Sequence, residues 1–186
     1  MASFFNTKLI KLEETLSTND FAYELLKKGK IKEGTVILSQ FQKQGKGQRG
    51  AKWESEYGKN ILMSIVLSPD ILVADQFQLN ICISLALYDF SKKYFPEKIK
   101  IKWPNDLLIR SKKVSGILQE LIQFEKRNFL IIGIGINTLH RPISKTFEAT
   151  SLLKCSNKLI DNSEILNNLK KNYETIFCDY KFNKNL

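Results

Sequence analysis

Hydrophobic residues in this chain occur in short runs that are separated by polar or glycine-containing turns, which is the pattern of a packed α/β protein. Each run is rich in β-branched and apolar residues and is too short for a typical helix, so each is predicted to be a strand. The strands predicted in this way cover residues 35–41, 61–67, 99–103, 107–110, 114–123 and 129–136. The last four follow one another with short polar turns, which predicts a meander.

Three other segments predict helices. The polar residues from Ser17 to Asp20 can cap a helix whose apolar residues share one face, and Gly29 can close it. Residues 75–94 alternate in polarity as a strand would, but the run is too long for a typical strand, so a buried helix is predicted. Residues 162–180 predict a closing helix.

The order of these elements predicts one domain. No internal repeat or low-complexity linker interrupts residues 1–186, and 43% hydrophobic residues are enough for a real core. We therefore expect a single α/β domain with a mixed, largely antiparallel sheet flanked by helices.

The chain is basic, because 29 Lys and Arg against 19 Asp and Glu give a net charge of +10. Such a surface attracts anionic partners. The lysines are scattered, and no arginine-rich or aromatic-interleaved run stands out, so a nucleic-acid partner is not expected. An acidic protein or a nucleotide fits the charge, and so does a merely solvated lysine-rich surface.

Cysteine and histidine usage argues against several kinds of site. The three cysteines are odd in number and have no C-x-x-C spacing, and His140 is the only histidine, so a disulfide framework or a zinc site is not expected. Neither a signal peptide nor an apolar run of membrane-spanning length is present. We expect a cytoplasmic protein without a membrane partner.

A glycine-rich loop follows the first of these predicted strands. Gly45, Gly47 and Gly50 match G-x-G-x-x-G, the dinucleotide-binding pattern, but that pattern requires a helix directly after it and a strand follows here. What remains is a loop whose backbone amides, with Lys46 and Arg49, can hold a carboxylate and a phosphate. A plain flexible connection is the alternative.

A second candidate site lies in the run Trp103-Pro104-Asn105-Asp106, which is followed by Lys113. A hairpin with its turn around residues 110–112 places Asp106 and Lys113 near each other. The lysine can then neutralise negative charge during phosphoryl or acyl transfer. The alternative is that Asp106 and Lys113 form an exposed ion pair that contributes little to stability, since the same residues at the same spacing would produce it.

Taken in order, these motifs resemble the catalytic domain of the biotin-protein ligases from about Leu12 to Asn137. The resemblance implies a fold like that of class II aminoacyl-tRNA synthetases and biotin synthetases. It also implies two reactions: biotin and Mg-ATP form biotinyl-5′-AMP, and a lysine of a biotin carboxyl carrier protein then takes the biotin. The matching stretches are Ser17-Thr18-Asn19, Gln42 to Trp53, Lys102 to Asp106, Lys113-x-x-Gly116-Ile117-Leu118-x-Glu120 and Gly133-x-Gly135-Ile136-Asn137.

Roles carried over by position divide the site into three sets. Biotin-binding residues are expected to be Ser17, Thr18, Asn19, Gln42, Gly45, Lys46, Gly47, Gln48, Lys113 and Gly116. Nucleotide-binding residues are expected to be Arg49, Trp53, Asn105, Gly135 and Asn137. Lys113 and Asp106 are the catalytic candidates, and Asp106 would orient or deprotonate the acceptor lysine. No metal site fixed in the protein is expected, because Mg²⁺ would arrive with ATP.

The sequence also departs from the family pattern. Lys46, Gln48 and Ala51 stand where the family loop usually carries arginine, so the intermediate should be held less tightly unless Arg49 or Lys52 compensates. Neither a winged helix before Leu12 nor a small C-terminal β-barrel is expected.

Three interpretations remain open beside the catalytic-only biotin ligase. A lipoate or octanoate ligase could share the scaffold, and a catalytically idle basic module could retain it. Exposed sheet edges could also pair with a second copy of the chain in a homodimer, or with the carrier protein.

Overall fold

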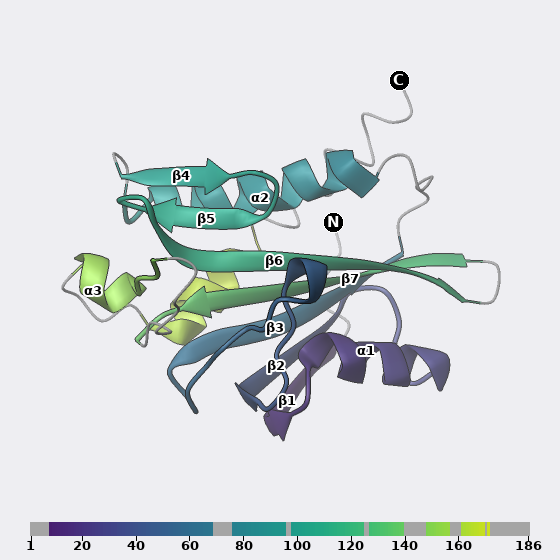
Figure 1. Ribbon diagram of the computed structural model, residues 1–186. Helices are drawn as coiled ribbons and strands as arrows, with labels where there is room; N and C mark the ends of the chain where they lie inside the picture. The colour runs from purple at the N-terminus through teal and green to yellow at the C-terminus, as the bar shows by residue number, and fades with distance from the viewer. Residues whose placement is uncertain are drawn as a thin grey trace.

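A seven-stranded sheet organises the computed structural model, which describes residues 8–68, 76–95, 98–124, 127–139, 148–156, 161–169 and 171. The strands lie in the order β1-β2-β3-β7-β6-β5-β4 (Figure 1). Only β1 and β2 run parallel, and every other neighbouring pair is antiparallel. The predicted mixed, largely antiparallel sheet flanked by helices is therefore confirmed.

The strands are β1 (Lys8–Thr15), β2 (Thr35–Gln42), β3 (Asn60–Leu67), β4 (Ile99–Lys102), β5 (Asp106–Ile109), β6 (Lys112–Phe124) and β7 (Arg127–Asn137). All six predicted strands are present, and β4 to β7 form the predicted meander. The sequence analysis missed β1, because none of its residues is buried and it therefore has no apolar run. It lies at the end of the sheet, where a strand needs little apolar surface.

Helix α1 (Thr18–Lys27) begins and ends as predicted. The side-chain oxygen of Ser17 accepts a hydrogen bond from the backbone N–H of Asp20 at 3.4 Å, which caps the helix. Gly29 follows its end with a φ of +62°, a left-handed conformation that glycine adopts at little cost.

The other helices match the predictions in part. Helix α2 (Gln76–Lys92) confirms the choice of a helix over a strand, and α3 (Leu152–Ser156) was not predicted. Residues 162–169 are helical, in agreement with the start of the predicted closing helix. Its remaining residues lie outside the described part of the chain, apart from residue 171, which is also helical.

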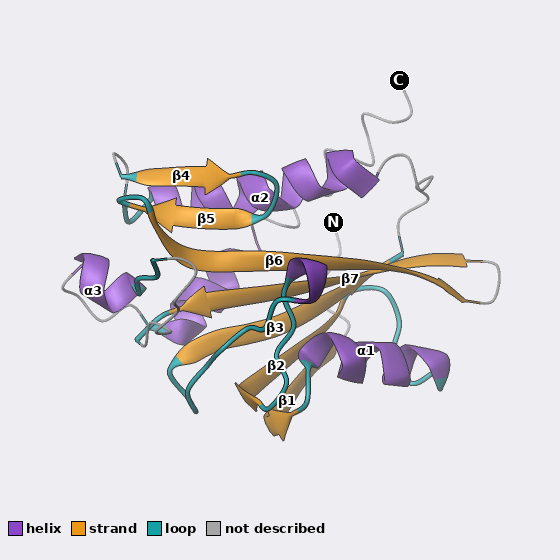
Figure 2. Cartoon of the chain, in the orientation of Figure 1, coloured by secondary structure: helices purple, strands orange, loops and turns teal. Residues whose placement is uncertain are grey.

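Alternate residues of the central strands face two separate cores. Val66 and Ile131 pack with Ala22 of α1, whereas their neighbours Ile65 and Ile132 pack on the α2 side. This is the consequence of the two-residue repeat of a strand. The two helices thus cover opposite faces of the sheet, with α1 near β1 to β3 and α2 behind β4 and β5 (Figure 2).

The loop between β2 and β3 folds over the α1 face. It contains the short helix η1 (Gln48–Gly50) and passes in front of β6 and β7 in Figure 1. The loop and the N-terminus of α1 together enclose the functional site described next. Within the described residues, no helix combines the length and the apolar character that crossing a membrane would require.

Candidate functional site

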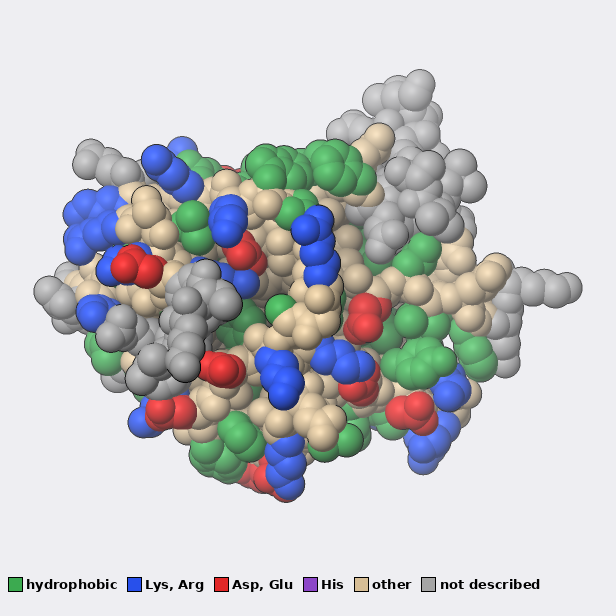
Figure 3. All heavy atoms as spheres, in the orientation of Figure 1, with side chains coloured by type: hydrophobic (Ala, Val, Ile, Leu, Met, Phe, Trp, Pro, Cys, Tyr) green, Lys and Arg blue, Asp and Glu red, His purple; other side chains and the backbone are tan. Residues whose placement is uncertain are grey.

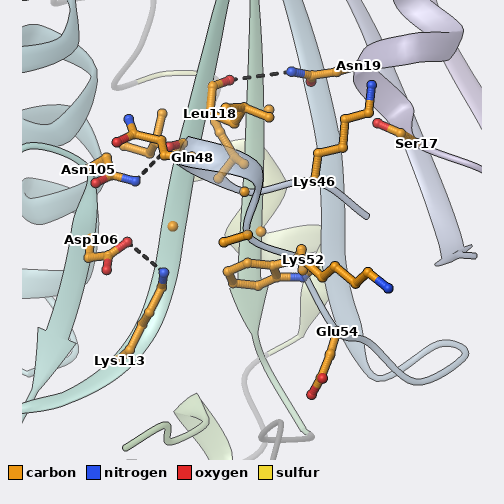
Figure 4. A pocket seen from close by; sticks show the side chains of 18 of the residues that line it. Ser17, Asn19, Lys46, Gln48, Lys52, Glu54, Asn105, Asp106, Lys113 and Leu118 are labelled. Atoms are coloured by element: carbon orange, nitrogen blue, oxygen red, sulfur yellow. Dashed lines mark hydrogen bonds and ion pairs between the residues drawn. The ribbon is translucent and has the colours of Figure 1, made fainter. Parts of the chain in front are cut away.

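A cavity of about 660 Å³ opens beside the N-terminus of α1, between the β2–β3 loop and strands β5 to β7. Figure 4 shows side chains from all these elements around it. Every predicted site residue lines the cavity except Gly45. Gly45 is a buried residue of the loop itself, and a Cβ added to it would meet the carbonyl oxygen of Trp53 at 2.5 Å. The cavity is also lined by residues for which no role was predicted: Ala51, Lys52, Glu54, Met63, Lys102, Trp103, Pro104, Ile117, Leu118, Gly133 and Ile134.

One end of the cavity is neutral and hydrogen-bonded. Ser17, Thr18 and Asn19 are each at most 3% exposed there. The backbone N–H of Thr18 donates to Gln42 Oε1 at 2.7 Å, which leaves the Gln42 amide nitrogen as its free donor. The side chains that would recognise a polar head group are therefore held in place before any ligand binds.

Ser64 on β3 and Glu120 on β6 orient this end, and neither was assigned a role from the sequence. Asn19 donates through Nδ2 to Glu120 Oε2 at 2.7 Å, so its Oδ1 accepts from Ser64 Oγ at 2.5 Å. Ser64 Oγ also lies 2.8 Å from the hydroxyl of Thr18. Ser64 has one hydroxyl hydrogen, which it gives to Asn19, and the Thr18 hydroxyl donates its own hydrogen to Gln42 Oε1 at 3.0 Å.

The other end of the cavity is charged. Lys113 Nζ lies 2.7 Å from Asp106 Oδ1, and the two side chains are only 19% and 16% exposed (Figure 4). The predicted proximity of these residues is confirmed. A bulge in the β5–β6 pairing shifts the register between Leu107 and Leu108, so that Asp106 pairs with Gly116 and Leu108 with Lys113.

Trp53 forms the floor between the two ends. Its ring lies against Gly116 and Gly135, where an added Cβ would come within 3.1 Å and 2.3 Å of ring carbons. Lys113 Nζ lies 5.7 Å from the centre of the same ring. The sequence analysis assigned Gly116 to biotin binding and Gly135 to nucleotide binding, and the structure places the Trp53 side chain against both glycines.

The glycine-rich loop is a hydrogen-bonded hairpin and not a plain connection. Trp53 N–H donates to the Gly45 carbonyl at 2.9 Å, and Gly47 N–H donates to the Ala51 carbonyl at 2.7 Å. The turn at its tip places Arg49 at a φ of 55°. No dinucleotide-type helix follows it, in agreement with the sequence analysis.

Lys46 on this hairpin is tied back to α1. Its Nζ lies 2.5 Å from Asp20 Oδ1, and both side chains are close to half exposed. The hydrogen bond to Asp20 is the main reason why the pKa of Lys46 is raised above its usual 10.5. Lys46 therefore carries its positive charge at the cavity throughout the neutral range.

Two asparagines predicted to bind nucleotide have partners within the protein. Asn105 donates to the carbonyl of Ile117 at 3.0 Å. Asn137 accepts from Asn60 and donates to the carbonyl of Thr150, each at 3.1 Å, so both ends of its amide are engaged. They fix the turn before β5 and the end of β7 at the cavity wall, and their contact with a nucleotide stays a prediction.

Helix α2 positions the Trp-Pro turn from the other side of the sheet. The carbonyl of Pro104 accepts hydrogen bonds from Asn80 Nδ2 at 3.0 Å and from Ser84 Oγ at 3.2 Å. One turn before Asn80, Phe77 stacks on Trp103 with ring centres 5.6 Å apart. The Trp103–Pro104 peptide bond is cis.

The acidic side chains in the cavity are few. Among the described residues, no group of three or more histidine, cysteine, aspartate or glutamate side chains could hold a metal ion. Glu54 and Asp106 are the carboxylates that line the cavity. Mg²⁺ keeps several waters and commonly binds one or two carboxylates together with substrate phosphates, so either carboxylate suits it without a second protein ligand.

Comparison with known sequences identifies the family. Residues 12–137 match the sequence pattern of the biotin/lipoate A/B protein ligase family. The chain belongs to this family. The matched residues run from β1 to the end of β7 and include most of the residues around the cavity.

Individual relatives within the family are biotin ligases. The bifunctional ligase/repressor BirA of Bacillus subtilis is 34% identical over 169 residues, which cover 88% of this chain and 52% of that protein. The biotin–[acetyl-CoA-carboxylase] ligase of Mycobacterium tuberculosis is 30% identical, and the match covers 90% of this chain and 63% of that protein. The chain thus spans about half the length of the first of these relatives and under two thirds of the second.

Solved structures of family members have the same fold. The biotin protein ligase of Aquifex aeolicus, solved in complex with biotin and ATP, superposes with a TM-score of 0.79 at 30% identity. The superposition covers 94% of this chain and 72% of that one. The predicted resemblance to the biotin-protein ligase catalytic fold is confirmed.

Proposed function

We propose that this family member is a biotin-protein ligase, which forms biotinyl-5′-AMP from biotin and ATP and transfers biotin to a lysine of a biotin carboxyl carrier protein. The observation that carries the proposal is the Lys113–Asp106 pair at 2.7 Å, which lies in a cavity with a neutral hydrogen-bonding end and a cationic end. A substrate with a polar, uncharged head and a carboxylate tail fits this division.

In the first step, a biotin carboxylate oxygen attacks the α-phosphorus of ATP. A new P–O bond forms, the P–O bond to the β-phosphate breaks, and pyrophosphate leaves. Lys113 supplies a fixed positive charge for the carboxylate and the α-phosphate, whose mutual repulsion otherwise opposes the reaction. Lys46, Arg49 and Lys52 line the same cavity and add charge toward the phosphates.

In the second step, the ε-amine of the acceptor lysine attacks the carbonyl carbon of biotinyl-5′-AMP. A C–N bond forms, the C–O bond to the phosphate breaks, and AMP leaves. Free lysine has a pKa of about 10.4 and is mostly protonated at neutral pH, so the site must take up or displace a proton. The carboxylate of Asp106 is the group that orients the ammonium or accepts its proton.

Glu54 and Asp106 are the carboxylates at the cavity that would hold Mg²⁺ arriving with ATP, and the ion would neutralise phosphate charge there. No metal site built from the protein alone is needed for this arrangement.

The choice of biotin over lipoate rests on the neutral end. The buried side chains of Thr18 and Asn19 and the partly exposed amide of Gln42 offer amide and hydroxyl groups, which match the N–H and C=O groups of the biotin ureido ring. The dithiolane ring of lipoate has neither group and so could not use the polar groups at this end, and a site built for a substrate's hydrogen-bonding groups rejects an analogue that lacks them. Relatives that are named as biotin ligases, at up to 35% identity over 70% of this chain, support the same choice.

The proposal also names the biological setting. The acceptor is a biotin carboxyl carrier protein of acetyl-CoA carboxylase or of a related carboxylase, and the reaction takes place in the cytoplasm. An idle basic module is a weaker interpretation, because the Lys113–Asp106 pair is intact.

ATP–pyrophosphate exchange tests the proposal. The purified protein is incubated with Mg-ATP and labelled pyrophosphate, together with biotin, with lipoate or with no acid. Exchange that requires biotin is the expected result. Exchange with lipoate alone would assign the chain to the lipoate branch, and no exchange with either acid would favour the idle module.

A further inference from the structure

The acceptor lysine can reach Asp106 only across the face of the sheet on which Asp106 lies. Lys102 pairs with Asp106 between β4 and β5, and Lys100 pairs with Leu108, so both lysines share the face of Asp106. The intervening residues Ile99 and Ile101 belong to the core on the α2 side. Any protein that inserts a lysine at Asp106 therefore covers Lys100 and Lys102.

The charge on β4 is not balanced within the described part of the chain. Lys98, Lys100 and Lys102 are all exposed, and no ion pair to them is found there. They alternate with the two isoleucines along a strand that ends the sheet. At about 3.3 Å per residue, the row extends roughly 13 Å from Lys98 to Lys102, which lines the cavity itself.

An exposed aromatic pair continues this row. Trp103 follows β4 directly and is 54% exposed, and its stacking partner Phe77 on α2 is 61% exposed. Trp103 lines the cavity, whereas Phe77 does not, so the pair extends from the mouth outward. Figure 3 shows hydrophobic side chains gathered over the start of α2 and the end of β4, with Lys and Arg side chains beside them.

We propose that Phe77, Trp103, Lys98 just before β4, and Lys100 and Lys102 on β4 form the docking surface for an acidic carrier domain that presents the acceptor lysine. We call these five residues the rim surface. The inference rests on the proposed function, because it identifies where the protein substrate of that reaction binds.

Two physical arguments favour an acidic protein as the occupant. Large exposed aromatic side chains are the usual anchors of protein interfaces, and unpaired cations around them select an acidic partner and speed its encounter. The position of the surface supplies the second argument, because it borders the cavity on the side from which a lysine side chain must enter.

The test separates docking from adenylation by measuring three reactions of the full chain. They are biotin-dependent pyrophosphate exchange, transfer to an isolated apo carrier domain of acetyl-CoA carboxylase, and transfer to hydroxylamine as a small acceptor. The variants are Phe77→Ala and Lys100→Glu, neither of which lines the cavity. Leu85→Ala is the control for Phe77→Ala, because Leu85 is another exposed apolar residue on α2. Lys30→Glu is the control for Lys100→Glu, because Lys30 is an exposed lysine that lies beyond the C-terminal end of α1.

We expect each rim variant to lower kcat/KM for the carrier about tenfold or more, since truncating an interface anchor commonly has effects of this size. Exchange and hydroxylamine transfer should remain unchanged. The Lys100→Glu effect should also shrink as salt is raised, because screening weakens the attraction between exposed charges. Both controls should behave as the wild type in all three reactions.

Two outcomes would overturn the inference in distinguishable ways. If both rim variants kept the wild-type kcat/KM for the carrier together with normal exchange, the inference alone would be overturned. That conclusion would hold even if Phe77→Ala converted a dimer of this chain to monomers, because the surface would then bind a second copy and not the carrier. Absence of biotin-dependent exchange in the wild type would overturn the proposed function and the inference together.

Discussion

The two ends of the cavity use polar side chains in opposite ways. At the neutral end, Asn19 and Ser64 are buried and bound to each other, and Glu120 fixes the amide of Asn19. At the charged end, Lys113 and Asp106 form an ion pair with Nζ 2.7 Å from Oδ1, and their side chains are 19% and 16% exposed. A rigid neutral end suits selection of one head group, because buried polar groups that lose a partner are costly. A charged end suits reacting phosphate and carboxylate groups, which carry charge but little shape specificity.

The largest expected effect comes from removing the positive charge of the charged end. Lys113→Ala should lower biotin-dependent pyrophosphate exchange by about two to three orders of magnitude, the range found when one preorganised electrostatic donor is removed from a site. Pyrophosphate exchange measures this directly. Lys112→Ala is the matched control, because Lys112 is the preceding residue and its side chain is 45% exposed in an ion pair with Glu148.

Loss of the Lys113 charge leaves Asp106 without that partner, so folding must be checked separately. Lys113→Met keeps most of the side-chain volume and should lose exchange to the same degree. Circular dichroism and thermal unfolding should show both variants folded. Near-normal exchange in either folded variant would show that the role of Lys113 is misassigned.

Two glycines of β7 allow each end to be disturbed alone. An added Cβ at Gly135 would lie 2.3 Å from the ring of Trp53, and one at Gly133 would lie 2.6 Å from Asn19 Oδ1. Such overpacking typically costs about 1–3 kcal/mol, and the displaced side chain is Trp53, a predicted nucleotide contact, in one case and Asn19 of the neutral end in the other. We expect Gly135→Ala to raise KM for ATP and Gly133→Ala to raise KM for biotin, each about tenfold or more.

Steady-state exchange kinetics with each substrate varied in turn measures this separation. The two variants serve as controls for each other, since they lie two residues apart on the same strand and face. Equal effects on both substrates in both variants would mean that the ends are not separate sites.

A smaller effect is expected from the hydroxyl of Ser64. Ser64→Ala leaves Asn19 Oδ1 without this donor, which should cost about 1–3 kcal/mol when the group is buried. KM for biotin should rise several-fold to tenfold, while KM for ATP should not change. Ser39→Ala is the control: Ser39 is buried on neighbouring β2, but its hydroxyl donates to the carbonyl of Phe41 and not to this network. A biotin KM that changes equally in both variants would remove the assigned role of Ser64.

The smallest effect is expected at the exposed pair of Lys46 and Asp20. Asp20→Asn should change the free energy of unfolding by less than about 1 kcal/mol, as for other exposed ion pairs. Because the pKa of Lys46 is raised in the folded state, its contribution is complete below pH 10.5 and is lost as the pH rises through the raised value. Urea unfolding at pH 8 and above pH 10.5 should show the difference between wild type and variant decreasing, and a difference that grows with pH would contradict the assignment.

Local patterns in the sequence predicted much of the fold and the charged end of the site. The apolar runs indicated β2 to β7, the cap at Ser17 indicated α1, and the turn before Lys113 brought this lysine to Asp106. Each of these features depends on residues that are close in the sequence, so that spacing alone constrains them.

Features that depend on distant segments were missed or misread. Ser64 lies within an apolar strand, and its partner Asn19 is 45 residues away. Trp53 covers Gly135 only because a loop folds across the sheet, so the glycines were assigned to ligand approach instead. Strand β1 has no buried residue and thus no apolar signal. These features become visible only when the sheet order is known.

Direct detection of the intermediate tests the central claim, which is that the two ends together make an acyl-adenylate. The wild type, Lys113→Ala and Lys112→Ala are each incubated with biotin and Mg-ATP, and the bound small molecules are identified by mass spectrometry. The account predicts biotinyl-5′-AMP with the wild type and with Lys112→Ala, and little or none with Lys113→Ala. Absence of biotinyl-5′-AMP from the wild type, or equal amounts with Lys113→Ala, would contradict it.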